Sequence, residues 1–265
     1  MSSHPVRRAA AAVSLSAIAL AGCGGGASTD GSPASDGASD QKQTLTVFAA
    51  ASLTSVYEEL EKQFEKTHPG VDVVLTTGGS SDLVTQIEQG APADVLATAD
   101  EKNMTKAEDG GLIAGKPTLF ATNELTIAVQ PGNPDHIEKL ADLSNPQMKV
   151  VRCAVPVPCG SVSDEVLKDA KVTFTPVSEE NSVTDVLGKV ASGEADAGLV
   201  YVTDIARSGG EAEGIAIPEA AGHRTNYPIA QVESSKQSEL AKEFIELVLS
   251  DDGKKVLEDA GFGAP

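Results

Sequence analysis

The sequence contains no tryptophan, and aromatic residues make up only 3% of its 265 positions. A hydrophobic core built from this chain must therefore consist mainly of Val, Leu, Ile and Ala, the residues that fill buried parallel sheets. Histidine is also rare, with 4 copies. No Ser/His/Asp set, nucleophile elbow, phosphate P-loop or well-spaced pair of acids is found, so the sequence offers no support for an enzyme.

Basic residues are few: 20 Lys and Arg stand against 39 Asp and Glu, and the formal net charge is −19. A surface this acidic argues against nucleic acid as a partner. It also repels anions at long range. Capture of an anion would therefore have to depend on local dipoles and not on attraction by the whole surface.

Long hydrophobic runs are confined to the N-terminus. Arg7 and Arg8 precede the apolar stretch Ala9–Leu20, which is too short to span a bilayer comfortably, and Leu-Ala-Gly-Cys follows. This tetrapeptide resembles a bacterial lipobox, which predicts a signal peptide over residues 1–22 and lipidation of Cys23. A plain secretory signal with a free Cys23, or an uncleaved anchor, remains an alternative. The arginine pair leaves both Sec and twin-arginine export open.

Residues 23–43 contain Gly, Ser, Ala, Asp and Thr but no large apolar side chain before the first strand. Such a segment cannot bury enough surface to offset the entropy of ordering, so we expect a disordered tether. Its typical reach is about 25 Å. Together with Cys23 it predicts a domain anchored to the outer face of the cytoplasmic membrane.

Cysteine is limited to 3 residues, and two of them lie close together. Cys153 and Cys159 flank Ala-Val-Pro-Val-Pro, and in an exported protein this arrangement is typical of a small disulfide loop. Two cysteines with no nearby histidine do not complete a zinc site. No histidine is placed as a base for a catalytic cysteine either.

Residues 44–265 alternate between short β-branched runs and amphipathic segments. We predict strands at Thr44–Ala50, Asp72–Thr77, Val95–Thr98, Leu125–Gln130, Lys149–Ala154, Val172–Thr175, Ala197–Val202 and Ile229–Val232. We predict helices at Leu53–Lys66, Asp82–Gln89, Lys102–Asp109, Ile137–Leu143, Asp164–Ala170, Val183–Ser192, Thr203–Arg207, Ser238–Leu249 and Asp252–Asp259. This pattern predicts an α/β fold with mainly parallel sheets, whose ligands bind at the carboxyl ends of the strands.

The first two strands are each followed by small residues and serines, and then at once by a helix. Ser52 follows the first strand, and Gly78-Gly79-Ser80-Ser81 follows the second. Free N–H groups and the helix dipole make such turns anion pockets. Ser52 could instead cap its helix, but a capping box from Ser55 to Glu58 would free it for a ligand.

Three motifs, FAAASLT, the serines of GGSSDL, and QIEQGAPAD, resemble the extracytoplasmic molybdate-binding proteins that feed ABC importers. The resemblance covers nearly all of residues 44–265. It implies a type II periplasmic-binding-protein-like fold with two α/β lobes and a ligand cleft between them. Residues 44–124 and 229–265 would form lobe 1 and residues 125–228 lobe 2, joined by crossover strands near Leu125–Val129 and Tyr227–Val232.

The resemblance also implies which residues hold the oxyanion. In the family, main-chain N–H groups and neutral hydroxyls surround the ion, and Ser81 would cap its helix beside the ligand-binding serine. The sequence departs from the family at one position, where a cysteine stands in place of a common alanine whose N–H binds the ion. The implied ligand set is Ser52, Ser80, Cys159, Val183 and Tyr201.

The function implied is capture of molybdate and tungstate and delivery to a membrane ABC permease by a monomer. No cofactor and no metal other than the bound oxyanion are implied. Another oxyanion, sulfate or phosphate, is the nearest alternative; Asp82 is the one acid near the predicted donors that could accept from protonated phosphate. An exported α/β hydrolase is the alternative from another class. Ferric iron would need more than Tyr201 as a ligand.

Overall fold

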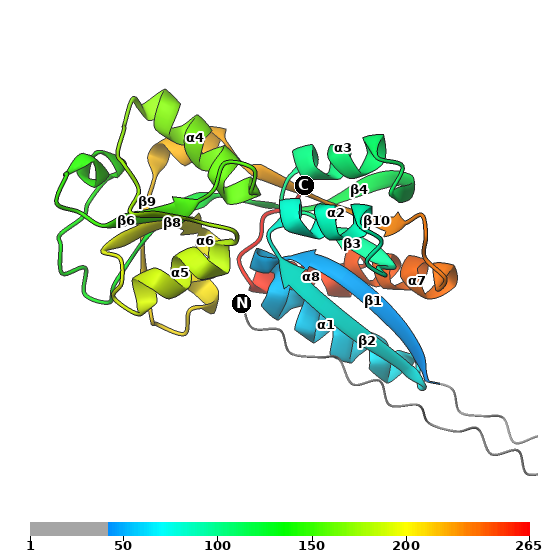
Figure 1. Ribbon diagram of the computed structural model, residues 1–265. Coiled ribbons are helices and arrows are strands. Elements are labelled where there is room, and N and C mark those ends of the chain that lie inside the picture. Colours follow the sequence, from blue (N-terminus) through cyan, green and yellow to red (C-terminus); the bar gives the residue numbers. More distant parts are fainter. Residues whose placement is uncertain (1–41) are drawn as a thin grey trace, which may run out of the picture. The chain divides into compact units, whose positions relative to one another are not determined.

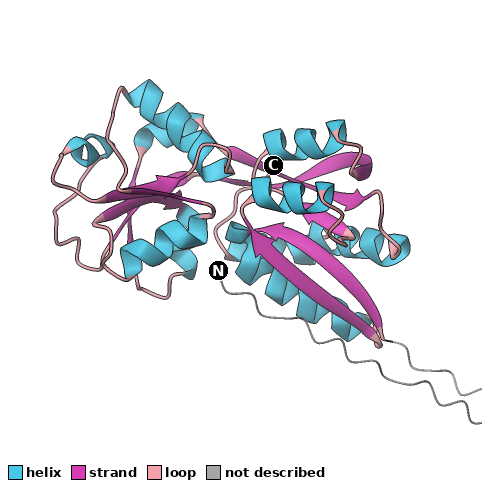
Figure 2. Ribbon diagram, viewed as in Figure 1, coloured by secondary structure: helices cyan, strands magenta, loops and turns pink. Residues whose placement is uncertain are grey.

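The computed structural model describes residues 42–265. The predicted signal peptide, the lipidation site Cys23 and nearly all of the predicted tether lie outside the described residues. Within residues 42–265 no helix has both the length and the apolar character needed to cross a membrane. The described chain forms two five-stranded mixed sheets with helices packed around them (Figures 1 and 2).

The first sheet has the strand order β2-β1-β3-β10-β4. β1 is parallel to β2 and β3, whereas β10 is antiparallel to β3 and β4. The carboxyl ends of β1, β2 and β3 therefore lie at one edge. The strands are β1 Gln43–Ala50, β2 Val71–Gly78, β3 Val95–Ala97, β4 Ile113–Asn123 and β10 Thr225–Val232.

Helices cover both faces of this sheet because side chains alternate between the faces along each strand. Val47 packs with α1, α7 and α8, while its neighbour Phe48 packs with α2 and α3 on the other face. Figure 1 shows these two groups of helices beside the sheet. The result is one lobe with three layers. The helices are α1 Thr54–Thr67, α2 Ser80–Glu88, α3 Glu101–Asp109, α7 Ser238–Leu249 and α8 Asp251–Asp259.

The scarce aromatic residues concentrate in this lobe, whose core still consists mainly of Val, Leu, Ile and Ala, as expected. Most of them gather on the α1, α7 and α8 side of the sheet. Tyr57 and Phe64 pack against Phe244, with ring centroids 5.9 and 5.4 Å apart. Tyr227 packs against Phe262 at 5.4 Å. A few large rings thus supply much of the buried apolar area of one lobe.

The second sheet has the order β7-β6-β8-β5-β9 and an aliphatic core. β6 is parallel to β7 and β8, and β5 is antiparallel to β8 and β9. Its strands are β5 Leu125–Val129, β6 Val150–Cys153, β7 Ser178–Glu180, β8 Ala197–Tyr201 and β9 Glu213–Ala216. Its helices are α4 Pro158–Ala170, α5 Val183–Ala191 and α6 Val202–Arg207, with short 3₁₀ turns η2 Leu140–Ser144 and η3 Pro218–Gly222.

The chain passes between the two sheets twice. It leaves the first sheet after Asn123, at the end of β4, and enters the second at Leu125, where β5 begins. It returns after η3, and β10 belongs to the first sheet from Thr225 onward. From the sequence we expect this return at residue 229, whereas Thr225–Pro228 lie with the first sheet and not the second.

Several local predictions were wrong, and the short strands β7 and β9 were not predicted. Residues 172–175 form no strand: Val172 and Phe174 pack against the core, but ladder pairing starts only at Ser178, after Pro176. The segment predicted as a helix near Ile137–Leu143 forms no α-helix, and only its part from Leu140 onward lies in the 3₁₀ turn η2. β4 was missed because it contains Gly, Lys and Pro117, which an edge strand tolerates.

Candidate functional site

The carboxyl ends of strands from both sheets meet the N-termini of helices around one small cavity. β1, β2 and β8 end beside it, and η1 (Ala51–Leu53), α2, α4 and α5 begin there. The N–H groups in the first turn of a helix have no partner within that helix, so they are available to a guest. All five residues predicted from the sequence line this cavity: Ser52, Ser80, Cys159, Val183 and Tyr201.

The cavity is small and its lining, within the described residues, includes no charged side chain. The space open to the centres of water-sized atoms amounts to about 10 Å³. That is the scale of a single small guest such as one water molecule, whereas organic ligands of drug-like size need several hundred Å³. The geometry therefore fits a compact inorganic guest that accepts hydrogen bonds.

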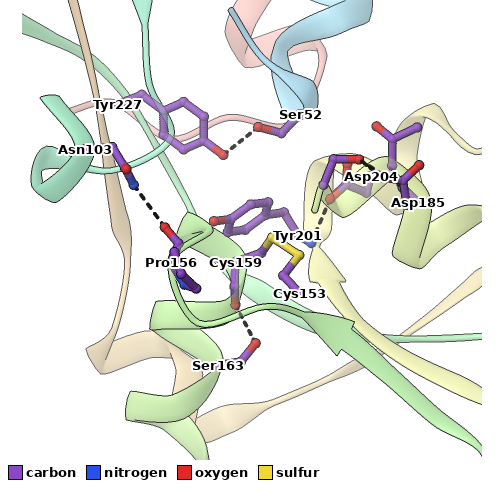
Figure 3. The surroundings of a disulfide bond; sticks show 12 residues. Ser52, Asn103, Cys153, Pro156, Cys159, Ser163, Asp185, Tyr201, Asp204 and Tyr227 are labelled. Atoms are coloured by element: carbon purple, nitrogen blue, oxygen red, sulfur yellow. Dashed lines mark hydrogen bonds between the residues drawn. A yellow bond between two sulfur atoms is a disulfide. The ribbon is translucent and has the colours of Figure 1, made fainter. Parts of the chain in front are cut away.

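Ser52 lies in the 3₁₀ turn η1 and is 2% exposed. Its hydroxyl caps no helix; it forms a buried hydrogen bond of 2.9 Å with the hydroxyl of Tyr227 (Figure 3). The predicted capping box is wrong, because α1 begins at Thr54 and Ser55 lies inside it. The added 3₁₀ turn moves the helix start and leaves Ser52 beside the cavity.

Ser80 is the first residue of α2 and is 1% exposed. Its hydroxyl oxygen accepts a hydrogen bond of 3.0 Å from the main-chain N–H of Ala99. Because the oxygen is used as an acceptor, the hydroxyl hydrogen remains free to donate toward the cavity. The prediction that Ser81 caps the helix was wrong, since the N-cap is Gly79 and no side chain caps this end.

Tyr201 ends β8 and is 1% exposed. Its hydroxyl has no hydrogen-bond partner anywhere in residues 42–265. An unpaired buried hydroxyl costs about 1–3 kcal/mol, so a guest that accepts from it gains that energy back. Burial raises the pKa of Tyr201 well above its usual value, so the group stays protonated and remains a donor.

The turn that carries Tyr201 is held by a buried carboxylate. Asp204 accepts from the main-chain N–H of Tyr201 at 2.8 Å and from the guanidinium of Arg207 at 2.8 and 3.0 Å (Figure 3 shows the first bond). Burial raises the pKa of Asp204, and Arg207 opposes that rise. These bonds fix the strand-to-helix turn and thereby the position of the Tyr201 ring.

Cys159 is the second residue of α4 and is joined to Cys153, at the end of β6, by a disulfide with the Cα atoms 5.7 Å apart (Figure 3). The carbonyl of Cys159 accepts from the hydroxyl of Ser163 at 2.6 Å. Gly160 lies directly against the backbone of Ala154, where a Cβ would clash. The disulfide and this close approach fix the first turn of α4 at the cavity.

We expect reduction of this disulfide to lower the free energy of unfolding by about 2 kcal/mol, because closing so short a loop restricts the unfolded chain only modestly. Denaturant unfolding with and without reductant measures the difference. A Cys153→Ser/Cys159→Ser variant is the control and should not respond to reductant. Two alkylatable thiols at these positions in non-reduced protein from the native envelope would contradict the disulfide.

Val183 is the first residue of α5, and its side chain is buried. The N-cap Ser182 accepts from the main-chain N–H of Asp185 at 3.2 Å and donates to its carboxylate at 2.7 Å. This cap satisfies the N–H of Asp185 and leaves that of Val183, at the first position, directed out of the helix end. The side chain of Val183 contributes packing only.

The two lobes touch at the rim of the cavity. Gly79, between β2 and α2, lies so close to the carbonyl oxygen of Asn181 that a Cβ on Gly79 could not fit. Nearby, Asn103 of α3 donates to the carbonyl of Pro156 at 3.4 Å (Figure 3). A glycine pair before a ligand-binding serine favours close approach of the backbone to the ligand. In the structure, the group that closely approaches Gly79 is instead the carbonyl of Asn181 in the other lobe.

Sequence reasoning missed two residues behind the cavity, Tyr227 and Asn123. Tyr227 contacts Ser52 and Asn123 through its hydroxyl, although the three lie far apart in the sequence. A usable signal existed: both are polar residues in segments where the chain was expected to cross between lobes. Their hydrogen bonds themselves could not be read from the sequence.

The acids that the sequence singles out lie outside the cavity lining. Asp94 is buried and accepts from the N–H of Thr46, whereas Asp164 pairs with Arg152. Asp82 is exposed and is not part of the cavity lining. Across the described chain, no three His, Cys, Asp or Glu side chains are grouped to hold a metal cation.

Comparison with known proteins agrees with this geometry. Residues 45–263 match the family of bacterial extracellular solute-binding proteins. The molybdate-binding protein ModA of Mycobacterium tuberculosis H37Rv is 43% identical over 95% of this chain and 96% of its own. The putative ABC transporter substrate-binding lipoprotein YvgL of Bacillus subtilis is 33% identical over 85% of this chain and 88% of its own.

A solved structure shares the fold. The periplasmic molybdate-binding protein of Azotobacter vinelandii superimposes with a TM-score of 0.72 at 24% identity, covering 83% of this chain and 99% of that one. The two sheets thus form the two lobes of a type II periplasmic binding protein, as predicted. The chain belongs to the family of bacterial extracellular solute-binding proteins.

Proposed function

We propose that the protein binds molybdate, and also tungstate, outside the cytoplasm and delivers it to a membrane ABC permease. The observation that carries this proposal is the small cavity in which helix N-termini and neutral hydroxyls converge, with no charged side chain among the described residues of its lining. A tetrahedral dianion such as molybdate accepts hydrogen bonds on all sides. Because it carries no hydrogen, it needs no hydrogen-bond acceptor from the protein. The relatives named for molybdate, one of them 43% identical, support this choice of oxyanion.

The binding chemistry follows from the donors present. The hydroxyls of Ser52, Ser80 and Tyr201 would donate to the oxyanion, together with the N–H groups of Ser52, Cys159 and Val183. Dipoles and hydrogen bonds in a water-excluded site are stronger than in water, so they can replace the hydration of the ion without a formal positive charge. No bond is made or broken, and membership in a binding-protein family decides against the exported hydrolase.

Selectivity would come from size and protonation. Monoprotonated phosphate needs a partner that accepts its hydrogen, and none of the described residues that line the cavity is a carboxylate. Sulfate carries the same charge as molybdate but has shorter bonds. Donors that are fixed at positions suited to the larger ion would therefore lie too far from the sulfate oxygens to form good hydrogen bonds. Each buried donor left unpaired costs about 1–3 kcal/mol, so two of them give roughly thirty-fold discrimination or more.

A thermal unfolding panel tests the proposal. At about 1,000 times the dissociation constant, molybdate should stabilise the purified protein by roughly 4 kcal/mol and raise the unfolding midpoint by several degrees. Tungstate should act alike and sulfate weakly. An unmoved midpoint with millimolar molybdate and tungstate, together with a rise on adding phosphate, would show that the oxyanion is a different one.

We also propose that the protein is a lipoprotein, with residues 1–22 as signal peptide, Cys23 lipidated and residues 23–43 as tether. The support is the lipobox-like Leu-Ala-Gly-Cys at Leu20–Cys23 and the Bacillus subtilis relative named as a lipoprotein. A tethered domain can move between free solute and its permease. Mass spectrometry of the N-terminal peptide of the native protein distinguishes a diacylated Cys23 from a free thiol.

A further inference from the structure

Tyr227 lies behind the proposed oxyanion site and does not belong to the cavity lining. It is on β10, its side chain is fully buried, and its ring packs among Phe120, Tyr201 and Phe262. Its hydroxyl has two hydrogen-bond partners, the Ser52 hydroxyl at 2.9 Å and the side-chain amide nitrogen of Asn123 at 3.2 Å. The direction of each hydrogen bond can be deduced from this arrangement.

The orientation of the Asn123 amide is the starting point. Its Oδ1 faces the main-chain N–H of Glu124 at 3.0 Å. A main-chain N–H can only donate, so the atom that faces it must be the carbonyl oxygen. The amide nitrogen therefore faces the Thr203 hydroxyl at 2.8 Å and the Tyr227 hydroxyl, and it donates to both.

Within the described residues, one acceptor lies within hydrogen-bond distance of the hydrogen of the Tyr227 hydroxyl. The oxygen of Tyr227 already accepts from Asn123, and an amide nitrogen takes no hydrogen in return. Burial raises the pKa of Tyr227, so the phenol keeps its proton. The hydroxyl of Thr225 also lies near, but its Oγ1 has no hydrogen-bond partner among the described residues. The acceptor within hydrogen-bond distance in residues 42–265 is therefore Oγ of Ser52, which accepts from Tyr227.

We propose that Asn123 and Tyr227 are positioning residues that make Ser52 an obligate donor toward the cavity. The hydrogen bonds run in one direction, from the Asn123 amide to the Tyr227 hydroxyl, from there to the Ser52 hydroxyl, and from Ser52 to the guest. A hydroxyl that accepts one hydrogen bond becomes a stronger donor in the next. This inference rests on the proposed function, because it assigns two further residues to the same oxyanion site.

We call this chain of hydrogen bonds from Asn123 through Tyr227 to Ser52 the relay. It also affects which anions the site accepts. Because the lone pair of Ser52 that faces Tyr227 is occupied, Ser52 is disposed to give a hydrogen and not to receive one. A fully deprotonated oxyanion can accept the hydrogen bond that Ser52 donates. An oxyanion that carries a hydrogen would direct its own donor toward another donor, the Ser52 hydroxyl. The relay therefore reinforces the exclusion of protonated anions.

The first test is calorimetric titration of Tyr227→Phe with sodium molybdate. We expect affinity to fall about three- to tenfold, because Ser52 loses the partner that orients it. Tyr57→Phe is the matched control: Tyr57 is a fully buried tyrosine of the same lobe whose hydroxyl has no partner among the described residues. It should bind like the wild type. Wild-type affinity in Tyr227→Phe would overturn the relay.

A double-mutant cycle separates positioning from a merely structural effect. In a Ser52→Ala background, Tyr227→Phe should cause less than a twofold further loss, because the relay acts through the hydroxyl that is already removed. An equal fold-loss in both backgrounds would show that Tyr227 acts independently of Ser52 and would overturn the proposal. Failure of the wild-type protein itself to bind molybdate would instead overturn the proposed function.

Asn123→Asp supplies a second variant in which the relay is reversed. A carboxylate accepts from Tyr227, so the phenol hydrogen turns away from Ser52 and the Ser52 hydrogen turns toward Tyr227. We expect a loss of tenfold or more that shrinks in the Ser52→Ala background. A loss of the same size in both backgrounds would identify simple charge repulsion and count against the relay.

Discussion

Replacing Gly79 by alanine should weaken molybdate binding by roughly 100-fold or more while leaving the ligand-free protein folded. The backbone of Gly79 has φ −64° and ψ 133°, which alanine adopts freely. The conflict is instead with Asn181 of the other lobe, whose carbonyl oxygen lies where the new Cβ would be. Lobes held apart by a methyl group cannot bring their donors onto one small ion.

Calorimetry measures the affinity, and X-ray scattering measures whether molybdate still compacts the variant. Gly188→Ala is the matched control, because Gly188 lies in α5 with nothing within 4 Å of a new Cβ. It should keep wild-type affinity and gain stability, since alanine favours a helix interior over glycine by about 1 kcal/mol. Normal affinity in Gly79→Ala would mean that the lobe contact is not needed for binding.

Tyr201→Phe and Ser52→Ala should each weaken molybdate binding by about ten- to 150-fold, because a hydrogen bond to a charged acceptor contributes roughly 1.5–3 kcal/mol. Their effects on folding should differ. Tyr201→Phe removes a buried hydroxyl that has no partner within residues 42–265, so the ligand-free protein should be no less stable. Ser52→Ala breaks the bond to Tyr227 and should cost about 1 kcal/mol.

Denaturant unfolding of the ligand-free proteins and calorimetry with molybdate give the two quantities separately. Lys102→Gln and Lys106→Gln are controls: both lysines are exposed and neither lines the cavity. Neutralising them should change affinity little, since the site attracts the ion through local donors and not through net charge. Wild-type affinity in Ser52→Ala and Tyr201→Phe would exclude the proposed site.

Local sequence patterns were enough to place Ser52 and the pair Ser80-Ser81 at the sheet edge, and the family resemblance then selected Ser80. Ser52 and Ser80 closely follow hydrophobic runs, and these runs form the strands β1 and β2. When a parallel strand ends and a helix begins, the residues between them must lie at the carboxyl edge of the sheet. For that reason the order of neighbouring residues along the chain is sufficient to predict that both serines lie at one edge.

Capping and edge-strand details were less predictable. Ser55 matches a capping box, yet the 3₁₀ turn η1 intervenes and Thr54 donates to the carbonyl of Ala51 instead. β4 exists because it pairs with β10, a strand about a hundred residues away, and its own composition favours a loop. Propensity and capping are weak local preferences, and tertiary pairing overrides them.

The sequence by itself determined the strand-to-helix turns that carry the serines and the disulfide pair Cys153 and Cys159, because each depends on neighbours within a few positions. The remaining predicted cavity residues came from the family resemblance and not from local pattern. Only the tertiary structure decided which distant residues meet. Gly79 faces Asn181, and Ser52 receives its hydrogen bond from Tyr227, through contacts between segments separated by about a hundred residues or more. Such contacts are set by how two sheets and their helices pack, and no local pattern encodes them.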